Sequence, residues 1–303
     1  MDGHIMQNQV VNFAVDYIMK NLRSELKVED VARACGYSPY YLERLFKAET
    51  GESMYSFMKR VKVEQSAFQL KVEKERSVST IGEEYGYSSS NYATLFKKHF
   101  GRTPAAFRRQ VYQELQESSF FHEPEAGLWD YERCSRNIHV AENREYFVLY
   151  ERRKGNYHNL VENWRDFLKK YEAFIGPDTV FLEITYDDPS IVPDDSCLYD
   201  ICMTVDRRDP RLMFQKTAAV GITSRIQTKT FPSTMTIPGG KYAVYRYAGY
   251  PKLIYKAYQS MLCSWLSETG YRIDHRLGYD IYHRIDEDTL YMELDICIPI
   301  KEK

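Results

Sequence analysis

A stretch of sixteen residues occurs twice in the first third of the chain, and this repeat limits the possible folds more than any other feature. Residues 36–51 read GYSPYYLERLFKAETG, and residues 86–101 read GYSSSNYATLFKKHFG. A shift of fifty positions aligns seven identities without a gap: Gly36/Gly86, Tyr37/Tyr87, Ser38/Ser88, Leu45/Leu95, Phe46/Phe96, Lys47/Lys97 and Gly51/Gly101. Such internal similarity indicates one supersecondary unit used twice.

Each copy predicts a short helix, a turn and a second helix. Apolar and small residues recur at helical spacing before each copy, at Val28, Val31 and Ala32 and at Val78, Ile81 and Gly82. Gly36 and Gly86 fit the left-handed residue that ends a helix. Ser38 and Ser88 can then cap the second helix with their hydroxyls.

The second helix of the first copy has one apolar and one polar face. Leu42, Leu45 and Phe46 share a face that can pack on the first helix. The residues Tyr40, Glu43, Arg44 and Lys47 then point outward. A helix-turn-helix presents its recognition helix to a DNA major groove in this way. A hairpin used only for packing is the alternative for one copy, but two copies in register favour DNA binding.

At this point the chain resembles the AraC/XylS family of bacterial transcription regulators. The resemblance runs from GYSPYYLERLFKAETG through SVSTIGEEYGYSSSNYATLFKKHFGRTPAAFRR and includes the family's closing pattern at Gly101, Pro104, Phe107 and Arg108. It implies an all-α domain over residues 7–110, with two helix-turn-helix units joined by a long helix. Double-stranded promoter DNA is the implied partner.

The joining helix is expected from Ser53 to about Val72. It is a polar helix rich in Lys59, Arg60, Lys62 and Lys71, with apolar residues between them. Eighteen helical residues span about 27 Å, which approaches the ~34 Å between successive major-groove faces on one side of B-DNA. The helix therefore predicts the spacing of two recognition helices.

The first unit offers the better candidates for reading bases. Arg44 can pair with a guanine edge, Glu43 can accept from cytosine, and the Tyr40 ring can lie against a thymine methyl. Ser38 and Lys47 flank them. In the second unit the equivalent positions hold short side chains, Ser90 and Thr94, beside Asn91. We expect that unit to read phosphates and DNA shape, through Ser88, Lys97 and Lys98. A solvated helix face is the alternative for each side chain.

Composition limits the remaining possibilities. The 303 residues, 44% of them hydrophobic, predict two domains with buried cores. No apolar run reaches the ~18 residues of a membrane helix, so we expect a cytoplasmic protein without membrane association. The six cysteines form no zinc-like pattern, and no cofactor or metal is predicted. Residues 1–112 hold 17 Lys and Arg against 13 Asp and Glu, whereas the rest holds 24 against 30, so only the first part is basic.

After a predicted linker at residues 111–139 the periodicity shifts toward two. Strands are predicted at 144–153, 179–187, 198–206, 240–247, 278–285 and 291–299, with helices near 158–174 and 251–267. LYDICMTV at 198–205 echoes ELDICIPI at 293–300, and each ends a strand, helix, strand, strand run. The fold class is therefore α+β, with an antiparallel sheet built from two β-α-β-β repeats and a groove at their junction.

Residues 140–301 resemble the GyrI-like small-molecule-binding domain. The residues that carry the resemblance are Gly155–Tyr157, Trp164, Ile184–Pro189, Leu198–Asp200, Ile237–Val244, Trp265, Tyr279–Tyr282 and Ile298–Pro299. A DNA-binding domain that precedes this domain resembles the Rob-type arrangement. The resemblance implies a small-molecule effector and places the family's buried carboxylate at Asp280.

An acidic side chain among aromatic rings suits a lipophilic cation, through charge pairing and cation–π contact. Asp280 and Tyr282 share one face of their predicted strand. The other aromatic candidates for the effector site are Trp164, Tyr199, Tyr245, Tyr258 and Tyr291. A solvated or salt-bridged strand residue is the alternative for Asp280.

The sequence therefore predicts a transcription regulator that is not an enzyme, binds promoter DNA and a lipophilic, aromatic or cationic effector, and has RNA polymerase as a further expected partner. Two alternatives stay open for the C-terminal domain. It could be a hydrolase in which Asp280 and Tyr282 activate water, or a module that binds a partner protein.

Overall fold

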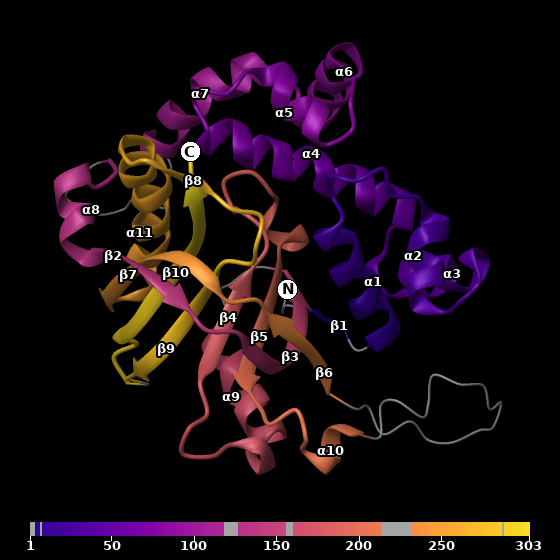
Figure 1. Cartoon of the computed structure of the whole chain (residues 1–303), viewed down its shortest axis with the longest axis vertical. Coiled ribbons are helices and arrows are strands. Elements are labelled where there is room, and N and C mark those ends of the chain that lie inside the picture. The colour runs from indigo at the N-terminus through magenta and orange to yellow at the C-terminus, as the bar shows by residue number, and fades with distance from the viewer. Residues whose placement is uncertain (1–3, 7, 118–126, 156–159, 214–231, 287) are drawn as a thin grey trace.

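A computed structural model describes residues 4–6, 8–117, 127–155, 160–213, 232–286 and 288–303. Helices from the first part of the chain form one layer, and a curved sheet with its own covering helices forms the rest (Figure 1). Residues 118–126 of the predicted linker and residues 156–157 of the predicted GyrI-like motif lie outside the described residues.

The helices and strands have the following bounds. The helices are α1 Gln9–Lys20, α2 Val28–Cys35, α3 Pro39–Thr50, α4 Met54–Val72, α5 Val78–Glu84, α6 Ser89–Phe100, α7 Pro104–Glu117, α8 Tyr131–Asn137, α9 Leu160–Lys170, α10 Pro210–Met213 and α11 Ile254–Ser260, the last continued by a π-helical turn Met261–Trp265. The strands are β1 His4–Met6, β2 Ile138–Asn143, β3 Tyr146–Lys154, β4 Phe181–Thr185, β5 Leu198–Thr204, β6 Ser233–Ile237, β7 Gly240–Gly249, β8 Tyr271–Ile273, β9 Tyr279–Ile285 and β10 Met292–Glu302.

The two helix-turn-helix units have the predicted turns. Gly36 and Gly86 are left-handed, with φ of 74° and 81°. Ser38 caps α3 by accepting a hydrogen bond from the Tyr41 amide, at 3.3 Å. Ser88 occupies the equivalent capping position of α6, but its side chain makes no capping hydrogen bond. Gly82, the small residue before the second copy, lies where α5 meets α6, and a Cβ on it would lie 2.6 Å from the Tyr92 ring.

The sheet is antiparallel and is built from the two predicted β-α-β-β repeats. Its strand order is β1-β3-β5-β4-β9-β10-β7-β2, with β6 on β3 and β8 on β10. The first repeat supplies β3, α9, β4 and β5, and the second supplies β7, α11, β9 and β10. Each repeat therefore has the same strand order from the edge inward, and β4 meets β9 at the centre. The strands β1, β2, β6 and β8, which the sequence analysis did not predict, extend this six-stranded core.

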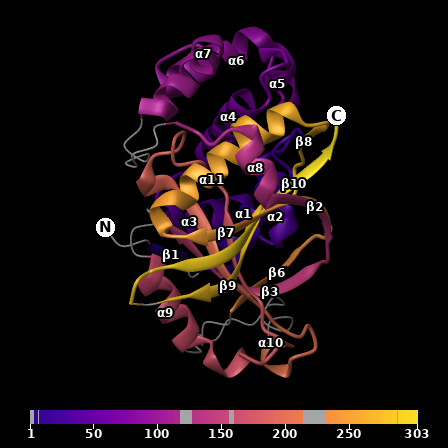
Figure 2. The ribbon, with the colours of Figure 1, turned by 90° about the vertical axis from the view of Figure 1, so that its left-hand side faces the viewer.

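The helices α9 and α11 cover one face of the sheet. Trp164 and Phe167 of α9 pack with Tyr199 and Ile201 of β5, whereas Ala257 of α11 packs with residues of β7 and β10. Figure 2 shows α11 in front of β7 and β10. The strip of sheet between the two helices is formed by β4 and β9, the junction of the repeats.

The helical layer packs directly on the sheet domain. Residues of α1 and α4 share one apolar cluster with Ile191 and Val192, in the segment between β4 and β5, and with Leu198 at the start of β5. The N-terminal strand β1 also pairs with β3, with Met6 opposite Arg152. The boundaries at residues 110 and 140 stay predictions; α7 continues to Glu117, and β2 begins at Ile138.

Candidate functional site

The recognition helix α3 presents a polar and aromatic face to solvent. Ser38, Tyr40, Arg44 and Lys47 are all exposed, and Tyr40 is 74% exposed. The Arg44 guanidinium lies 6.0 Å from the centre of the Tyr40 ring, so the two side chains are neighbours on this face. Figure 1 shows α3 and α6 on the outer side of the helical layer, away from the strands.

Glu43 has a local partner that the sequence did not reveal. Its carboxylate accepts a hydrogen bond from the Met54 amide, at 3.3 Å from each oxygen, and so caps the first turn of α4. A carboxylate at a helix N-terminus is stabilised by the exposed amides and the helix dipole. This contact competes with base reading by Glu43 and leaves Arg44 and Tyr40 as the stronger candidates on α3.

The equivalent face of α6 is shorter and less aromatic. The predicted residues Ser88, Ser90, Asn91, Thr94, Lys97 and Lys98 are all exposed. The Thr94 hydroxyl donates to the Ser90 carbonyl at 3.0 Å, which satisfies it within the helix. The two lysines in the last turn are the charged groups that this face offers to phosphates.

Exposed tyrosines also surround α3, and the sequence analysis did not select them. Tyr37 stacks on Tyr41 with ring centroids 5.2 Å apart, and both are exposed. Tyr55, at the start of α4, is 63% exposed. Large exposed aromatic residues are a signature of a binding surface, and the only sequence signal for them was the tyrosine content of residues 37–55.

In the sheet domain, Asp280 lies under the edge of α11. It is 3% exposed, and the Tyr258 hydroxyl of α11 donates to its Oδ1 at 2.5 Å. Burial, together with the neighbouring negative charge of Glu183, raises the pKa of Asp280 well above its usual range, although the Tyr258 hydrogen bond opposes this. Burial therefore disfavours the ionised form of this carboxyl group.

A second carboxylate, Glu183, lies beside it and was not predicted. Glu183 is 3% exposed and accepts hydrogen bonds from the Trp164 indole at 3.3 Å and the Tyr282 hydroxyl at 3.2 Å. Burial raises its pKa to about 7, although both hydrogen bonds lower it. A sequence signal existed, because Glu183 interrupts the apolar strand Phe181–Thr185 at a position that faces the helices.

The structure brings together four of the seven predicted effector residues, namely Trp164, Tyr258, Asp280 and Tyr282. With Glu183 they form what we call the carboxylate site, between α9 and α11 over the β4/β9 junction. Its two carboxylates are buried, whereas Tyr258 and Tyr282 are half-buried and cover them. The Tyr258 hydroxyl occupies Oδ1 of Asp280, and the Tyr282 hydroxyl occupies Oε2 of Glu183.

The other three predicted aromatic residues have other hydrogen-bond or ring partners. Tyr199 is buried under α9, where its hydroxyl accepts from the Asn163 amide at 2.8 Å. Tyr245 lies on β7, two strands away from β9, and stacks on Trp129 with ring centroids 6.0 Å apart. Tyr291 precedes β10 and makes an edge contact with Tyr250. Period-two alternation gives the face of a strand residue but not its strand neighbours, so it could not separate these residues from the site.

Two buried ion pairs fasten the helical layer to the sheet domain. Arg152 of β3 is fully buried and donates to Asp200 of β5 at 2.8 and 2.7 Å and to Asp16 of α1 at 2.7 Å. Lys71 of α4, predicted on a polar helix, is instead fully buried and pairs with Asp188 at 2.5 Å. Burial raises the pKa of Asp188, but the Lys71 ammonium more than reverses this, so the net shift is downward.

Asp188 also connects to α11. Its oxygens accept from the Tyr255 hydroxyl and the Gln259 amide, each at 3.3 Å. These residues flank Tyr258, which holds Asp280. One short helix therefore contacts the carboxylate site and the ion pair that anchors α4.

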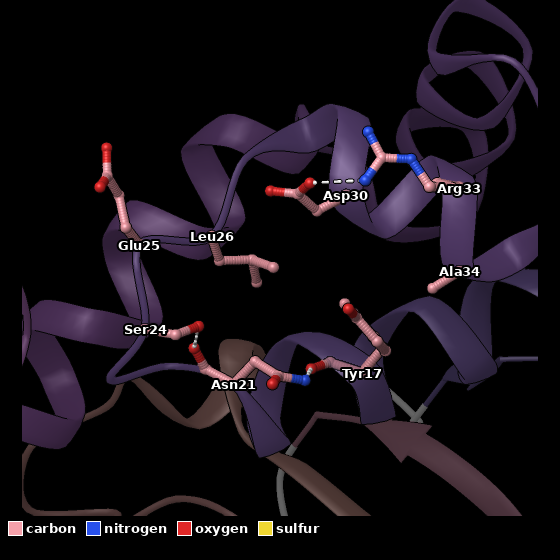
Figure 3. Close-up of a pocket in the computed structure, with 8 residues that line it drawn as sticks. All are labelled: Tyr17, Asn21, Ser24, Glu25, Leu26, Asp30, Arg33 and Ala34. Atoms are coloured by element: carbon pink, nitrogen blue, oxygen red, sulfur yellow. Dashed lines mark hydrogen bonds and ion pairs between the residues drawn. The ribbon is translucent and has the colours of Figure 1, made fainter.

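A separate surface hollow lies between α1 and α2 (Figure 3). It has a volume of about 280 Å³ and is lined by Tyr17, Asn21, Ser24, Glu25, Leu26, Asp30, Arg33 and Ala34. Several of its polar groups are already paired, including Arg33 with Asp30 at 3.3 Å and the Asn21 amide with the Tyr17 carbonyl at 2.7 Å. We assign no ligand to it.

Metal-binding clusters and membrane-spanning helices are both absent from the residues that the structure describes. In that part of the chain no group of three or more His, Cys, Asp or Glu side chains is arranged to hold a metal ion. None of the helices in the same residues is long and apolar enough to cross a membrane.

Two protein-family models match the chain in the order that the fold suggests. A helix-turn-helix domain model matches residues 31–110, and a model of GyrI-like small molecule binding domains matches residues 137–301. Together with the exposed faces of α3 and α6, these matches define a DNA-binding transcription regulator with an attached small-molecule-binding domain. The chain belongs to the AraC/XylS family, and its C-terminal half is a GyrI-like domain.

The similar curated proteins match the helical part. The multiple antibiotic resistance protein MarA of Escherichia coli (strain K12) is 34% identical over 113 residues, which are 37% of this chain and 87% of MarA. The probable transcription factor PqrA of Proteus vulgaris is 35% identical over 106 residues, 34% of this chain and 86% of PqrA. Similarity to transcription regulators therefore covers the DNA-binding part.

Solved structures match each half separately. The C-terminal domain of AraT, a response regulator from Geobacillus stearothermophilus, has 32% identity and a TM-score of 0.33, and it covers 34% of this chain and 87% of that domain. The EcmrR C-terminal domain has 12% identity and a TM-score of 0.40, and it covers 55% of this chain and 98% of that domain.

Proposed function

We propose that the protein regulates transcription by binding an asymmetric promoter site with α3 and α6 and by sensing a lipophilic cation at the carboxylate site. The observation that carries the effector part is Asp280, a buried carboxylate that is partnered by a tyrosine hydroxyl and surrounded by aromatic rings. Such a group gains most from a ligand that brings a positive charge and an apolar surface. We further propose cytoplasmic location, a role without catalysis, and RNA polymerase as a partner.

The two recognition helices have unequal roles in this proposal. The side chains of α3 include Arg44, which can form paired hydrogen bonds with guanine, and Tyr40, which can contact a thymine methyl group. On α6 the exposed lysines, Lys97 and Lys98, suit phosphate contacts. The 19-residue helix α4 sets the distance between the two units.

Contacts of α11 offer a physical route between effector and DNA. A cation at Asp280 displaces the Tyr258 hydroxyl, and the same helix holds Asp188 through Tyr255 and Gln259. Asp188 in turn holds Lys71 of α4. The ligand thus favours one of two positions of α11, and α4 transmits the choice to both recognition helices.

DNA reading is tested with two matched variants on a duplex selected for binding to the wild type. Arg44→Ala should weaken binding at one base position by about 1–3 kcal/mol and relax specificity there. Lys97→Ala should weaken binding to the selected duplex and to a random duplex alike. Equal loss of both duplexes in Arg44→Ala would contradict base reading by α3.

Effector binding is tested by thermal shift with lipophilic cations and their neutral isosteres. Cations should stabilise the wild type, and Asp280→Asn should lose that stabilisation while keeping its own melting transition. A response to neutral compounds alone would remove Asp280 as the anchor. No response to any compound would favour the partner-protein alternative.

A further inference from the structure

The two halves of the carboxylate site are related by the internal repeat. Glu183 and Asp280 are direct partners in the register of β4 and β9, so their side chains leave the sheet on the same face. Trp164 of α9 donates to Glu183, and Tyr258 of α11 donates to Asp280. Each carboxylate is therefore held by a donor from the helix of its own repeat.

Each covering helix also contacts the central strand of the other repeat. Trp164 also reaches Tyr282, two residues after Asp280, with ring centroids 5.3 Å apart. Tyr258 also makes a hydrogen bond with Thr185, two residues after Glu183. The arrangement is thus close to two-fold symmetric, with the approximate axis passing between the two carboxylates.

Within the residues that the structure describes, neither Glu183 nor Asp280 forms an ion pair with a Lys, Arg or His side chain. Burial is the main cause that raises the pKa of each; the other groups that act are Trp164 and Tyr282 on Glu183, and Glu183 and Tyr258 on Asp280, and none of these is cationic. By contrast, the other buried acids in the described part of the sheet domain form ion pairs: Asp200 with Arg152, Glu151 with Arg153 and Lys170, and Asp295 with Arg246. Glu183 and Asp280 are adjacent acids in a small-molecule-binding domain, and together they can pair with two positive charges of a ligand.

We propose that Glu183 is a second anchor of the effector site and that the effector is a dication, with one cationic nitrogen on each carboxylate and an apolar body between the aromatic rings. This inference rests on the proposed function, because it concerns the same site. Paired strand residues have Cβ atoms roughly 4.5–5.5 Å apart. Two carboxylates that diverge from such a pair can accept nitrogens on opposite ends of one aromatic ring.

The balance of charge explains why the site should prefer a dication to a monocation. A monocation ionises one carboxyl group and leaves its neighbour neutral, because two adjacent buried negative charges repel each other. A dication supplies a partner for each carboxylate, so both ionise and one further proton leaves the site. Trp164, Tyr258 and Tyr282 then contact the body of the ligand instead of the carboxylate oxygens.

The test compares two probes of nearly equal shape, p-xylylenediamine and 4-methylbenzylamine, by isothermal titration calorimetry on the full chain. The wild type should bind the diamine about tenfold more tightly or better. Titrations at pH 6 in buffers of different ionisation enthalpy should show about one more proton released for the diamine. Glu183→Gln, which keeps the side-chain shape, should reduce the preference to about twofold, the statistical advantage of two amines.

The outcomes separate this inference from the proposed function. Failure of both amines to bind the wild type, at concentrations where a buried carboxylate should respond, overturns both. Binding of 4-methylbenzylamine, with a diamine preference that is unchanged in Glu183→Gln, overturns the second anchor alone. Asp280→Asn serves as the matched variant on the other repeat and should lose the diamine preference to a similar degree.

Discussion

The two repeats of the sheet domain carry the same ion pair in different surroundings. In the first repeat Arg152 of β3 lies opposite Asp200 of β5, and in the second Arg246 of β7 lies opposite Asp295 of β10. The sequence echo DIC at 200–202 and 295–297 places the two acids at equivalent positions. Arg152 is fully buried because α1 covers it, whereas the Arg246 side chain is 60% exposed.

The difference shows how one motif acquires two roles. The helical layer docks on the first repeat, and Asp16 of α1 adds a second carboxylate to Arg152. Removal of one partner from such a buried cluster leaves uncompensated charge, which is costly. The second repeat keeps its pair in contact with water, where an ion pair contributes little. The contribution of each Arg–Asp pair to the free energy of unfolding therefore depends on whether the helical layer buries it.

The largest expected effect is that of Arg152→Met compared with Arg246→Met. Arg152→Met leaves Asp16 and Asp200 facing each other without a cation and should lower the free energy of unfolding by about 3–5 kcal/mol. Arg246→Met should lower it by at most about 1 kcal/mol. Urea unfolding followed by circular dichroism measures both. Equal losses in the two variants would show that docking of α1 contributes nothing to the difference.

A second effect concerns the pH dependence that the carboxylate site imposes. The pKa of Glu183 rises from its ordinary 4.5 to about 7 on folding, so the folded state binds the proton more tightly. Stability from this group is therefore fully present below pH 4.5 and is lost as the pH rises to 7. The loss amounts to about 3 kcal/mol.

Glu183→Gln isolates that contribution. Unfolding free energies of the wild type and the variant, measured between pH 5 and about 8, should converge at low pH and diverge as the pH rises, with the variant more stable. Asp187, whose pKa is also raised to about 7, contributes to both curves and cancels in the difference. Parallel curves would mean that Glu183 stays ionised in the folded protein, and the site would then hold a cation that the contacts do not reveal.

Sequence reasoning reached the fold and four of the five residues of the carboxylate site. Gly36, Gly86 and the repeated apolar spacing specify local backbone geometry, which neighbouring residues determine, so the helix-turn-helix units were predictable. Period-two alternation gave the core strands and placed Asp280 and Tyr282 on one face. Both inferences depend on residues close in sequence.

Long-range pairing was out of reach. Lys71 looks like a solvated helix residue because its partner Asp188 lies 117 positions away. Glu183 interrupts an apolar strand, but its partner Asp280 is known only once β4 is placed beside β9. The short strand β1 gives no periodic signal of its own and is defined by pairing with β3.

The smallest expected effect compares the two covering helices in DNA binding. Tyr258 of α11 is linked through Tyr255, Gln259 and Asp188 to α4, whereas Trp164 of α9 packs with residues of its own repeat and with Tyr282. Tyr258→Phe frees α11 from Asp280 and should weaken binding to a selected duplex about two- to fivefold, because α4 then positions α3 and α6 less firmly. Trp164→Phe should leave DNA affinity unchanged. Fluorescence anisotropy measures the DNA affinity of both variants.

A double-mutant cycle of Tyr258→Phe with Lys71→Met tests whether the link runs through the Lys71–Asp188 ion pair. If the Tyr258→Phe effect persists undiminished in the Lys71→Met background, the two substitutions are additive, and the route from the carboxylate site to the DNA does not pass through Asp188.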